Sequence, residues 1–236
     1  MRALDGELML VAWERSRDRP EQEGALALLE LAAPEQPFDE LAILPLAERN
    51  ALLLELRAIT LGRRMEGFAT CPDCGAQLEF AVDPRELATG LSAPPPELID
   101  ESAGLTMRPA NTRDLLACLE AGDDDEACSI LLARTLGIEK LDARRSAQKW
   151  PQSLFDRFDA MNATAEIRVQ LLCASCRGRQ LLDLDIARFI VREVALAARR
   201  LMADIHALAT AYGWSERAIA AMSGARRAAY LEMLSE

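Results

Sequence analysis

Two Cys-x-x-Cys motifs lie far apart in this chain of 236 residues. The first is Cys71-Pro-Asp-Cys74, followed by a glycine, and the second is Cys173-Ala-Ser-Cys176, with a glycine two places on. Two thiolates at this spacing can bind one metal ion from a tight turn, and zinc prefers four soft ligands in a tetrahedron. The four cysteines therefore predict one structural zinc site, whose halves are separated by the 98 residues between Cys74 and Cys173.

The sequence beside each motif has the alternation of a half-buried strand. Apolar residues recur at every second position after the first motif and before the second: Leu78, Phe80, Val82, Ile167, Val169 and Leu171. Two hairpin tips that face one another would form a zinc ribbon. The usual gap between the pairs is roughly 15–20 residues. The segment between them is therefore predicted to be an insertion, which is tolerable because loop-closure cost grows only logarithmically with length.

Most of the remaining chain has helical character, since Ala, Leu, Glu and Arg dominate and only 5% of residues are aromatic. A loop or short turn is expected at 34–45, an acidic turn at 121–127 and a hairpin that turns at 101–104. Serines at 215 and 223 are expected to cap the last two helices. Helices are expected at 1–32 with a break near Pro20, at 46–61 ending at Gly62, from Asn111 onward, and at 128–136, 151–161 and 187–236. The last of these carries an apolar stripe along one side, at Ile190, Val194, Ala197, Leu201, Ile205 and Leu208.

These elements predict an α+β fold that is mostly α-helical. Its small antiparallel zinc-ribbon-like β element is formed by the two distant motifs, and it carries a helical insertion and a C-terminal helical hairpin. The expected regions are an N-terminal helical region at 1–64, the first half of the ribbon at 65–96, an inserted α/β unit at 97–161, the second half of the ribbon at 162–186 and a C-terminal helical region at 187–236.

Other interpretations of the motifs are buried core cysteines, two redox dithiols, or a site that has lost its metal. A redox Cys-x-x-Cys usually opens a helix within a βαβ unit, and neither motif here is followed by a helical pattern. Because four thiolates leave no open position for water, the site is expected to be structural. Cys118 and Cys128 occupy apolar helical positions and are expected in the core.

The rest of the sequence gives little support to catalysis, and we expect no catalytic residues and no small-molecule substrate. The one histidine, His206, lies within a long helix and is interpreted as a solvated residue. The run Asp123–Glu126 lacks the ligand spacing of a calcium loop. A net charge of −11 argues against nucleic-acid binding, because phosphate backbones repel an acidic protein. No apolar run is long enough to span a membrane and the start does not resemble a signal peptide, so a cytoplasmic protein is expected.

The C-terminal helices have the outline of a helix-turn-helix, which leaves a zinc-ribbon transcription regulator as an alternative. Residues 187–236 carry seven arginines and five acidic residues, less positive charge than a DNA reader normally concentrates there. Packing of these helices together or onto a partner is the favoured interpretation. The candidate partner-binding residues are Trp214, Arg226, Arg227 and Tyr230.

Several stretches also resemble a known family. They are, in order, LPLAERNALLLELRAITLGRRMEGFATCPDCGAQLEF, RPANTRDLLACLE, CASCRGRQLLDLDIARFIVREV and MADIHALATAYGWSERAIAAMSGARRAAYLEML. From about residue 41 to the end, the chain resembles the zinc-ribbon-containing phage baseplate or baseplate hub assembly proteins of contractile tails and phage-tail-like injection systems. The four cysteines match the family's motifs, whereas Ala174-Ser175 and Arg177-Gly178 depart from its commoner residues.

This resemblance implies a non-enzymatic part in building or forming a baseplate, through binding of baseplate or hub proteins and with zinc as the bound metal. It leaves open whether the chain is an assembly chaperone or stays in the finished particle. The transcription regulator and, as a third interpretation, a thiol redox protein remain as alternatives.

Overall fold

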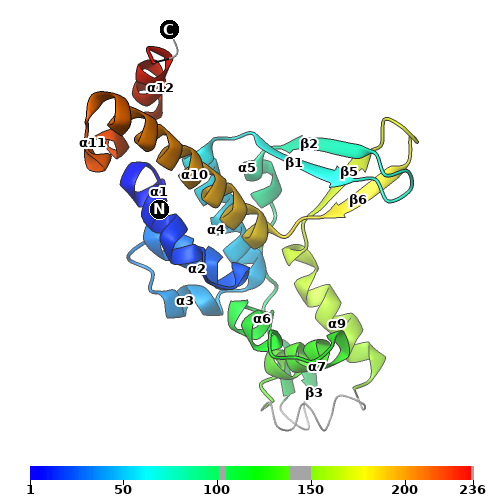
Figure 1. The fold of residues 1–236 in the computed structure, drawn as a ribbon. Helices are drawn as coiled ribbons and strands as arrows, with labels where there is room; N and C mark the ends of the chain where they lie inside the picture. The colour runs from blue at the N-terminus through cyan, green and yellow to red at the C-terminus, as the bar shows by residue number, and fades with distance from the viewer. Residues whose placement is uncertain (101–104, 139–149, 235–236) are drawn as a thin grey trace.

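The computed structural model describes residues 1–100, 105–138 and 150–234. Most of these residues are helical, and the strands form three two-stranded antiparallel sheets within the described ranges (Figure 1). The expected mostly helical α+β fold class is therefore confirmed. No helix in these ranges is both long and apolar enough to cross a membrane.

A helical body forms the largest part of the molecule. It consists of α1 (Gly6–Ser16), α2 (Glu21–Ala32), α3 (Phe38–Ile43), α4 (Leu46–Leu61) and the long α10 (Ile186–Tyr212), which lies across α1, α2 and α4 (Figure 1). The apolar stripe predicted on the last of these helices is buried, except that Ala198 rather than Ala197 takes its middle position. At 27 residues, α10 is about 40 Å long.

Helix α3 corrects the prediction of a loop or short turn at 34–45. It begins after Pro37 and buries Leu41 and Ala42 in the core of the body. A helix of six residues is less than two turns long, so its sequence is too short to display a helical period.

Buried polar side chains on α4 join this helix to other helices of the body and to the neighbouring segments. Arg49 donates to Gln22 Oε1 at 2.6 Å and to Thr112 Oγ1 at 3.0 Å. Arg57 forms a two-pronged ion pair with Glu193 of α10 at 2.9 Å. The same guanidinium donates to the carbonyls of Gly62 and Arg64, at the start of the first hairpin. Charged hydrogen bonds therefore fix the point at which this hairpin leaves the body.

The ribbon consists of the hairpin β1–β2 (Met65–Thr70 and Gln77–Val82) and the hairpin β5–β6 (Arg168–Leu172 and Arg179–Asp183). The hairpins lie side by side (Figure 1), and their inner faces share a small core of Cys71, Leu78, Phe80, Leu171 and Cys173. A Cβ at Gly67 would lie 2.4 Å from the ring of Phe80, so this glycine makes room for the ring. The short helix α5 (Pro84–Ala88), which the sequence patterns did not predict, follows the first hairpin and packs on α4.

The segment between the hairpins contains β3 (Glu97–Asp100), β4 (Leu105–Met107), α6 (Thr112–Cys118), α7 (Asp124–Thr135), α9 (Gln152–Asn162) and the 3-10 turn η2 (Ala163–Ala165). β3 and β4 pair antiparallel, whereas the turn expected at 101–104 lies outside the described residues, as do residues 139–149. A separate apolar cluster holds the segment together, with Met107, Leu132, Leu136 and Met161 buried in it.

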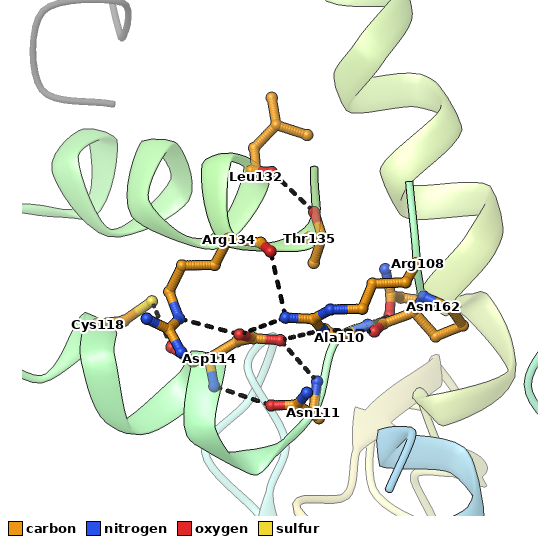
Figure 2. Close-up of polar contacts among 10 residues, drawn as sticks. Arg108, Ala110, Asn111, Asp114, Cys118, Leu132, Arg134, Thr135 and Asn162 are labelled. Carbon is orange, nitrogen blue, oxygen red and sulfur yellow. Dashed lines mark hydrogen bonds and ion pairs between the residues drawn. The ribbon is translucent and has the colours of Figure 1, made fainter. Parts of the chain in front are cut away.

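One carboxylate organises the attachment of this segment (Figure 2). Asp114 is fully buried, forms a capping box with Asn111 at the start of α6, and accepts hydrogen bonds from both Arg108 and Arg134. Next to it, Ala110 donates to Asn162 Oδ1 at 2.9 Å, and its carbonyl accepts from the Leu46 amide. The loop before α6 therefore ties α4, α7 and α9 together.

The chain ends in α11 (Glu216–Ala220) and α12 (Gly224–Glu232), at the end of α10 opposite to the ribbon (Figure 1). Ser215 and Ser223 cap them as predicted, and Gly213 ends α10 in the left-handed conformation. A Cβ at Gly6 would lie 2.5 Å from the Ala220 carbonyl oxygen, so this glycine lets α11 approach the start of α1.

Candidate metal centre

The two cysteine motifs form the same tight turn at the tips of the two hairpins. In each turn the amide of the first cysteine donates to the carbonyl five residues later: Cys71 to Ala76 at 2.8 Å, and Cys173 to Gly178 at 2.9 Å. The residue after the second cysteine donates back to the carbonyl of the first, at 2.9 Å in the first turn and 2.8 Å in the second. Both turns therefore hold their two thiols in the same local geometry.

The position after the second cysteine is left-handed in both turns. Gly75 has φ 73° and Arg177 has φ 60°. In the second turn the left-handed residue is therefore an arginine, although a glycine follows directly after it. A left-handed conformation costs a residue with a side chain roughly 1–2 kcal/mol. Arg177 is therefore a strained residue that sequence spacing alone did not identify.

The four sulfurs converge on one point between the tips. Cys71 Sγ lies 3.7 Å from Cys176 Sγ, and Cys74 Sγ lies 3.6 Å from Cys173 Sγ. All four ligand atoms lie within 4.8 Å of one another. A regular tetrahedron with sulfurs about 2.3 Å from zinc has edges of about 3.8 Å, so these side chains fit the group that the sequence predicted.

The pKa values of the thiols diverge within this cluster. The hydrogen bond from the Cys176 amide lowers the pKa of Cys173 to about 6, against the effect of burial and with help from the Ser175 amide. The Gly178 amide lowers the pKa of Cys176, but burial and the hydrogen bonds with neighbouring sulfurs outweigh it and raise the pKa to about 12. Close thiolates repel one another and share protons, whereas a divalent cation among them favours deprotonation of all four.

A polar contact outside the sulfurs links the two tips. Gln180 Nε2 of the second hairpin donates to Asp73 Oδ2 of the first at 2.6 Å. Within the second tip, the Gly178 amide lies 3.4 Å from Cys176 Sγ. A Cβ at Gly178 would approach the Asp73 carboxylate to 2.9 Å, so the glycine leaves room for this cross-hairpin contact. Sequence reasoning did not find the Asp73–Gln180 pair, because residues 107 positions apart give no local pattern.

The other two cysteines are not part of this cluster. Cys118 is half-buried and its Sγ lies 3.2 Å from the Asp114 carbonyl oxygen. Cys128 is exposed, which contradicts the expectation that it lies in the core, because its helix α7 turns this position to solvent. The acidic turn expected at 121–127 is corrected, because Asp123 is the N-cap of α7 and Asp124–Glu126 form its first turn, where carboxylates complement the helix dipole. His206 is exposed on α10.

The candidate partner-binding residues lie near the chain's end. Trp214 stacks on Tyr212 with ring centroids 4.6 Å apart and meets Tyr230 edge-on at 4.8 Å. Arg226 lies over the Tyr230 ring at 5.9 Å. Arg227 points inward instead, with 14% of its side chain exposed, and contacts Asp204 and the Met222 carbonyl. The structure thus brings Trp214, Arg226 and Tyr230 together in one surface cluster and gives Arg227 an internal ion pair.

Comparison with known proteins tests the baseplate part of the resemblance expected from the sequence, but not its zinc-ribbon part. Neither the curated proteins nor the solved structures gave a significant match. A protein family described as T4 bacteriophage base plate protein matches residues 5–133, which is more than half of the chain. The match covers α1 to α4, the first hairpin and the inserted segment as far as most of α7, and it ends before the second pair of cysteines and α10. The chain belongs to this family of phage baseplate proteins.

Proposed function

We propose that the chain is a non-enzymatic structural or assembly component of the baseplate of a contractile tail or contractile injection system. It binds other baseplate or hub proteins, and one zinc ion holds its ribbon in the folded state. On this proposal the chain works in the bacterial cytoplasm, where the particle is assembled, either as a chaperone or as a part that remains in the particle. The convergence of four cysteine sulfurs in a chain of a baseplate family carries the proposal.

The geometry of the four sulfurs favours a structural metal over a catalytic one. With all four positions of a tetrahedral ion taken by thiolates, neither water nor substrate can reach the metal. Two close sulfur–sulfur contacts, at 3.6 and 3.7 Å, also join one hairpin to the other. This arrangement favours a cross-link between hairpins over a dithiol that cycles within one motif.

Co-purification and particle assembly test the function. The tagged chain is coexpressed with the neighbouring tail genes, beside a Cys74→Ser/Cys173→Ser variant and a matched Cys128→Ser control with an exposed thiol. The wild type and the control should retain a baseplate or hub protein, and the double variant should lose it. If the wild type retains none and deletion of its gene leaves particle assembly intact, the proposal is wrong.

The transcription-regulator alternative loses support from the charge geometry of the last two helices. It requires Arg217, Arg226 and Arg227 on one exposed face, but Arg227 is mostly buried and forms an ion pair with Asp204. Salt-dependent DNA binding by the purified chain would revive this alternative.

A further inference from the structure

The ribbon has two outer faces that carry apolar side chains into solvent. In β1–β2 the inner core residue Phe80 pairs with Gly67, so the neighbouring pair Phe68 and Glu79 points outward. Glu66 lies on the same outer face, two residues before Phe68. Phe68 is 71% exposed, although it and the buried Phe80 are the largest apolar side chains of this hairpin. We call Glu66, Phe68 and Glu79 the acidic face.

The second hairpin also exposes apolar side chains on its outer face, but the charge beside them is positive. Val169 and Leu182 pair on the inner face, so the pairs Gln170–Leu181 and Leu172–Arg179 point outward. Leu172 is 68% exposed and Leu181 is 62% exposed, and they are diagonal neighbours across the two strands. We call Leu172, Arg179 and Leu181 the basic face.

The two faces lie on opposite sides of the ribbon, because the hairpins pack against each other through their inner faces. Some of the charge on these faces is already neutralised within the chain, since Arg64 pairs with Glu66 and Arg168 pairs with both Glu166 and Asp183. In the described part of the chain, Glu79 and Arg179 have no ion-pair partner. Each face therefore presents an exposed apolar centre beside one unpaired charge, and the two charges are opposite in sign.

We propose that the acidic face of one copy docks on the basic face of a second copy. Phe68 then packs against Leu172 and Leu181, and Glu79 meets Arg179. Such a contact is head-to-tail, so each copy uses both faces, and repetition produces a ring or an open chain. The proposal rests on the proposed role of metal in holding the ribbon folded.

The size of the faces sets the expected strength of the contact. Each face is one side of a two-stranded hairpin about five residues long. With a rise of about 3.4 Å per residue, it covers roughly 200 Å². This area is well below the roughly 800 Å² that each partner buries in a standard interface. A single contact is therefore weak, and repetition around a closed ring supplies additional stability because every copy is held twice. We expect association of the free chain only toward concentrations of about 1 mM.

Two single variants test the head-to-tail geometry by sedimentation velocity on the metal-loaded full chain. Phe68→Lys places positive charge opposite the basic face, and Leu181→Glu places negative charge opposite the acidic face. Each should lower the association constant at least tenfold. An equimolar mixture should regain association, because one variant keeps an intact basic face and the other keeps an intact acidic face. Leu196→Glu is the matched control, since Leu196 is an exposed leucine of α10 outside both faces.

Charge reversal gives a second, independent arm. Glu79→Arg and Arg179→Glu should each weaken association, and the double variant should restore it, because each reversed face again meets its complement. Metal content is measured for every sample, so that loss of the ribbon's metal is distinguished from loss of the contact.

Three results would overturn the proposal. The wild type, loaded with metal, could remain monomeric at about 1 mM. Either single variant could self-associate like the wild type, which would mean that like faces meet. The mixture of Phe68→Lys and Leu181→Glu could fail to associate, which would mean that the two faces bind a different protein of the particle.

Discussion

The helical body and the ribbon differ in the amount of apolar surface that each can bury. Among the residues that the structure describes, the core of the body contains 27 buried residues, contributed mainly by five helices and the chain ends. The core of the ribbon contains five of the described residues, and two of these are cysteines of the candidate metal centre. Hydrophobic burial suffices to fold the first region, whereas so small a core in the second requires a cross-link. Residues in the two regions should therefore respond differently to loss of metal.

Removal of one metal ligand should have the largest effect. Cys173→Ser is expected to abolish tight metal binding, because structural zinc sites of this kind contribute about 10–16 kcal/mol of apparent binding free energy. Hydrogen exchange should show that amides of β1, β2, β5 and β6 lose protection while those of α10 keep it. Cys118→Ser, outside the cluster, should change stability by less than about 1 kcal/mol. Equal effects of the two variants would contradict the distinction between the regions.

Loss of the buried carboxylate should weaken the attachment of the inserted segment and leave the ribbon's metal in place. Asp114→Ala leaves two arginines and a helix start without their acceptor. We expect destabilisation of about 3–5 kcal/mol in thermal or denaturant unfolding. Asp39→Ala is the control, since Asp39 pairs with Arg113 at the surface with 83% of its side chain exposed, and it should cost at most about 1 kcal/mol. Similar losses in both variants would show that burial is not the cause.

Crowding of the ribbon's small core should have a smaller effect. Gly67→Val forces the Phe80 ring out of its place and should cost about 1–3 kcal/mol of ribbon stability. Ala81→Val, on the exposed outer face of the same hairpin, should be neutral or slightly stabilising. Metal affinity measured by chelator competition reports the difference. Equal affinities would mean that the packing of Phe80 contributes nothing to the site.

The smallest expected effect is a gain. Arg177→Gly removes a left-handed residue that has a side chain, and should raise the stability of the metal-loaded ribbon by up to about 1 kcal/mol. Gly75→Ala, at the equivalent position of the other turn, should lower it by a similar amount. Chelator competition measures both changes, and an Arg177→Gly variant with weaker metal affinity would show that its guanidinium has a role beyond the turn.

Local patterns predicted most of what is local. The period-two alternation identified β2 and β5, the apolar stripe identified α10, and serine caps identified α11 and α12. The spacing of the cysteines predicted their convergence, because the chemistry of zinc supplies a reason for distant residues to meet. The helices α3 and α5 are too short to carry a period, and the exposure of Cys128 depends on how α7 packs. Contacts such as Asp73–Gln180 depend on the assembled ribbon, so no segment of sequence contains them.

X-ray absorption spectroscopy of the purified chain tests most directly whether one ion joins the two hairpins. The predicted result is one zinc per chain, bound by four sulfurs at about 2.3 Å, with loss of that signal in Cys74→Ser and in Cys173→Ser alike. A metal bound by nitrogen or oxygen ligands would contradict the account. So would a signal that depends on only one of the two motifs.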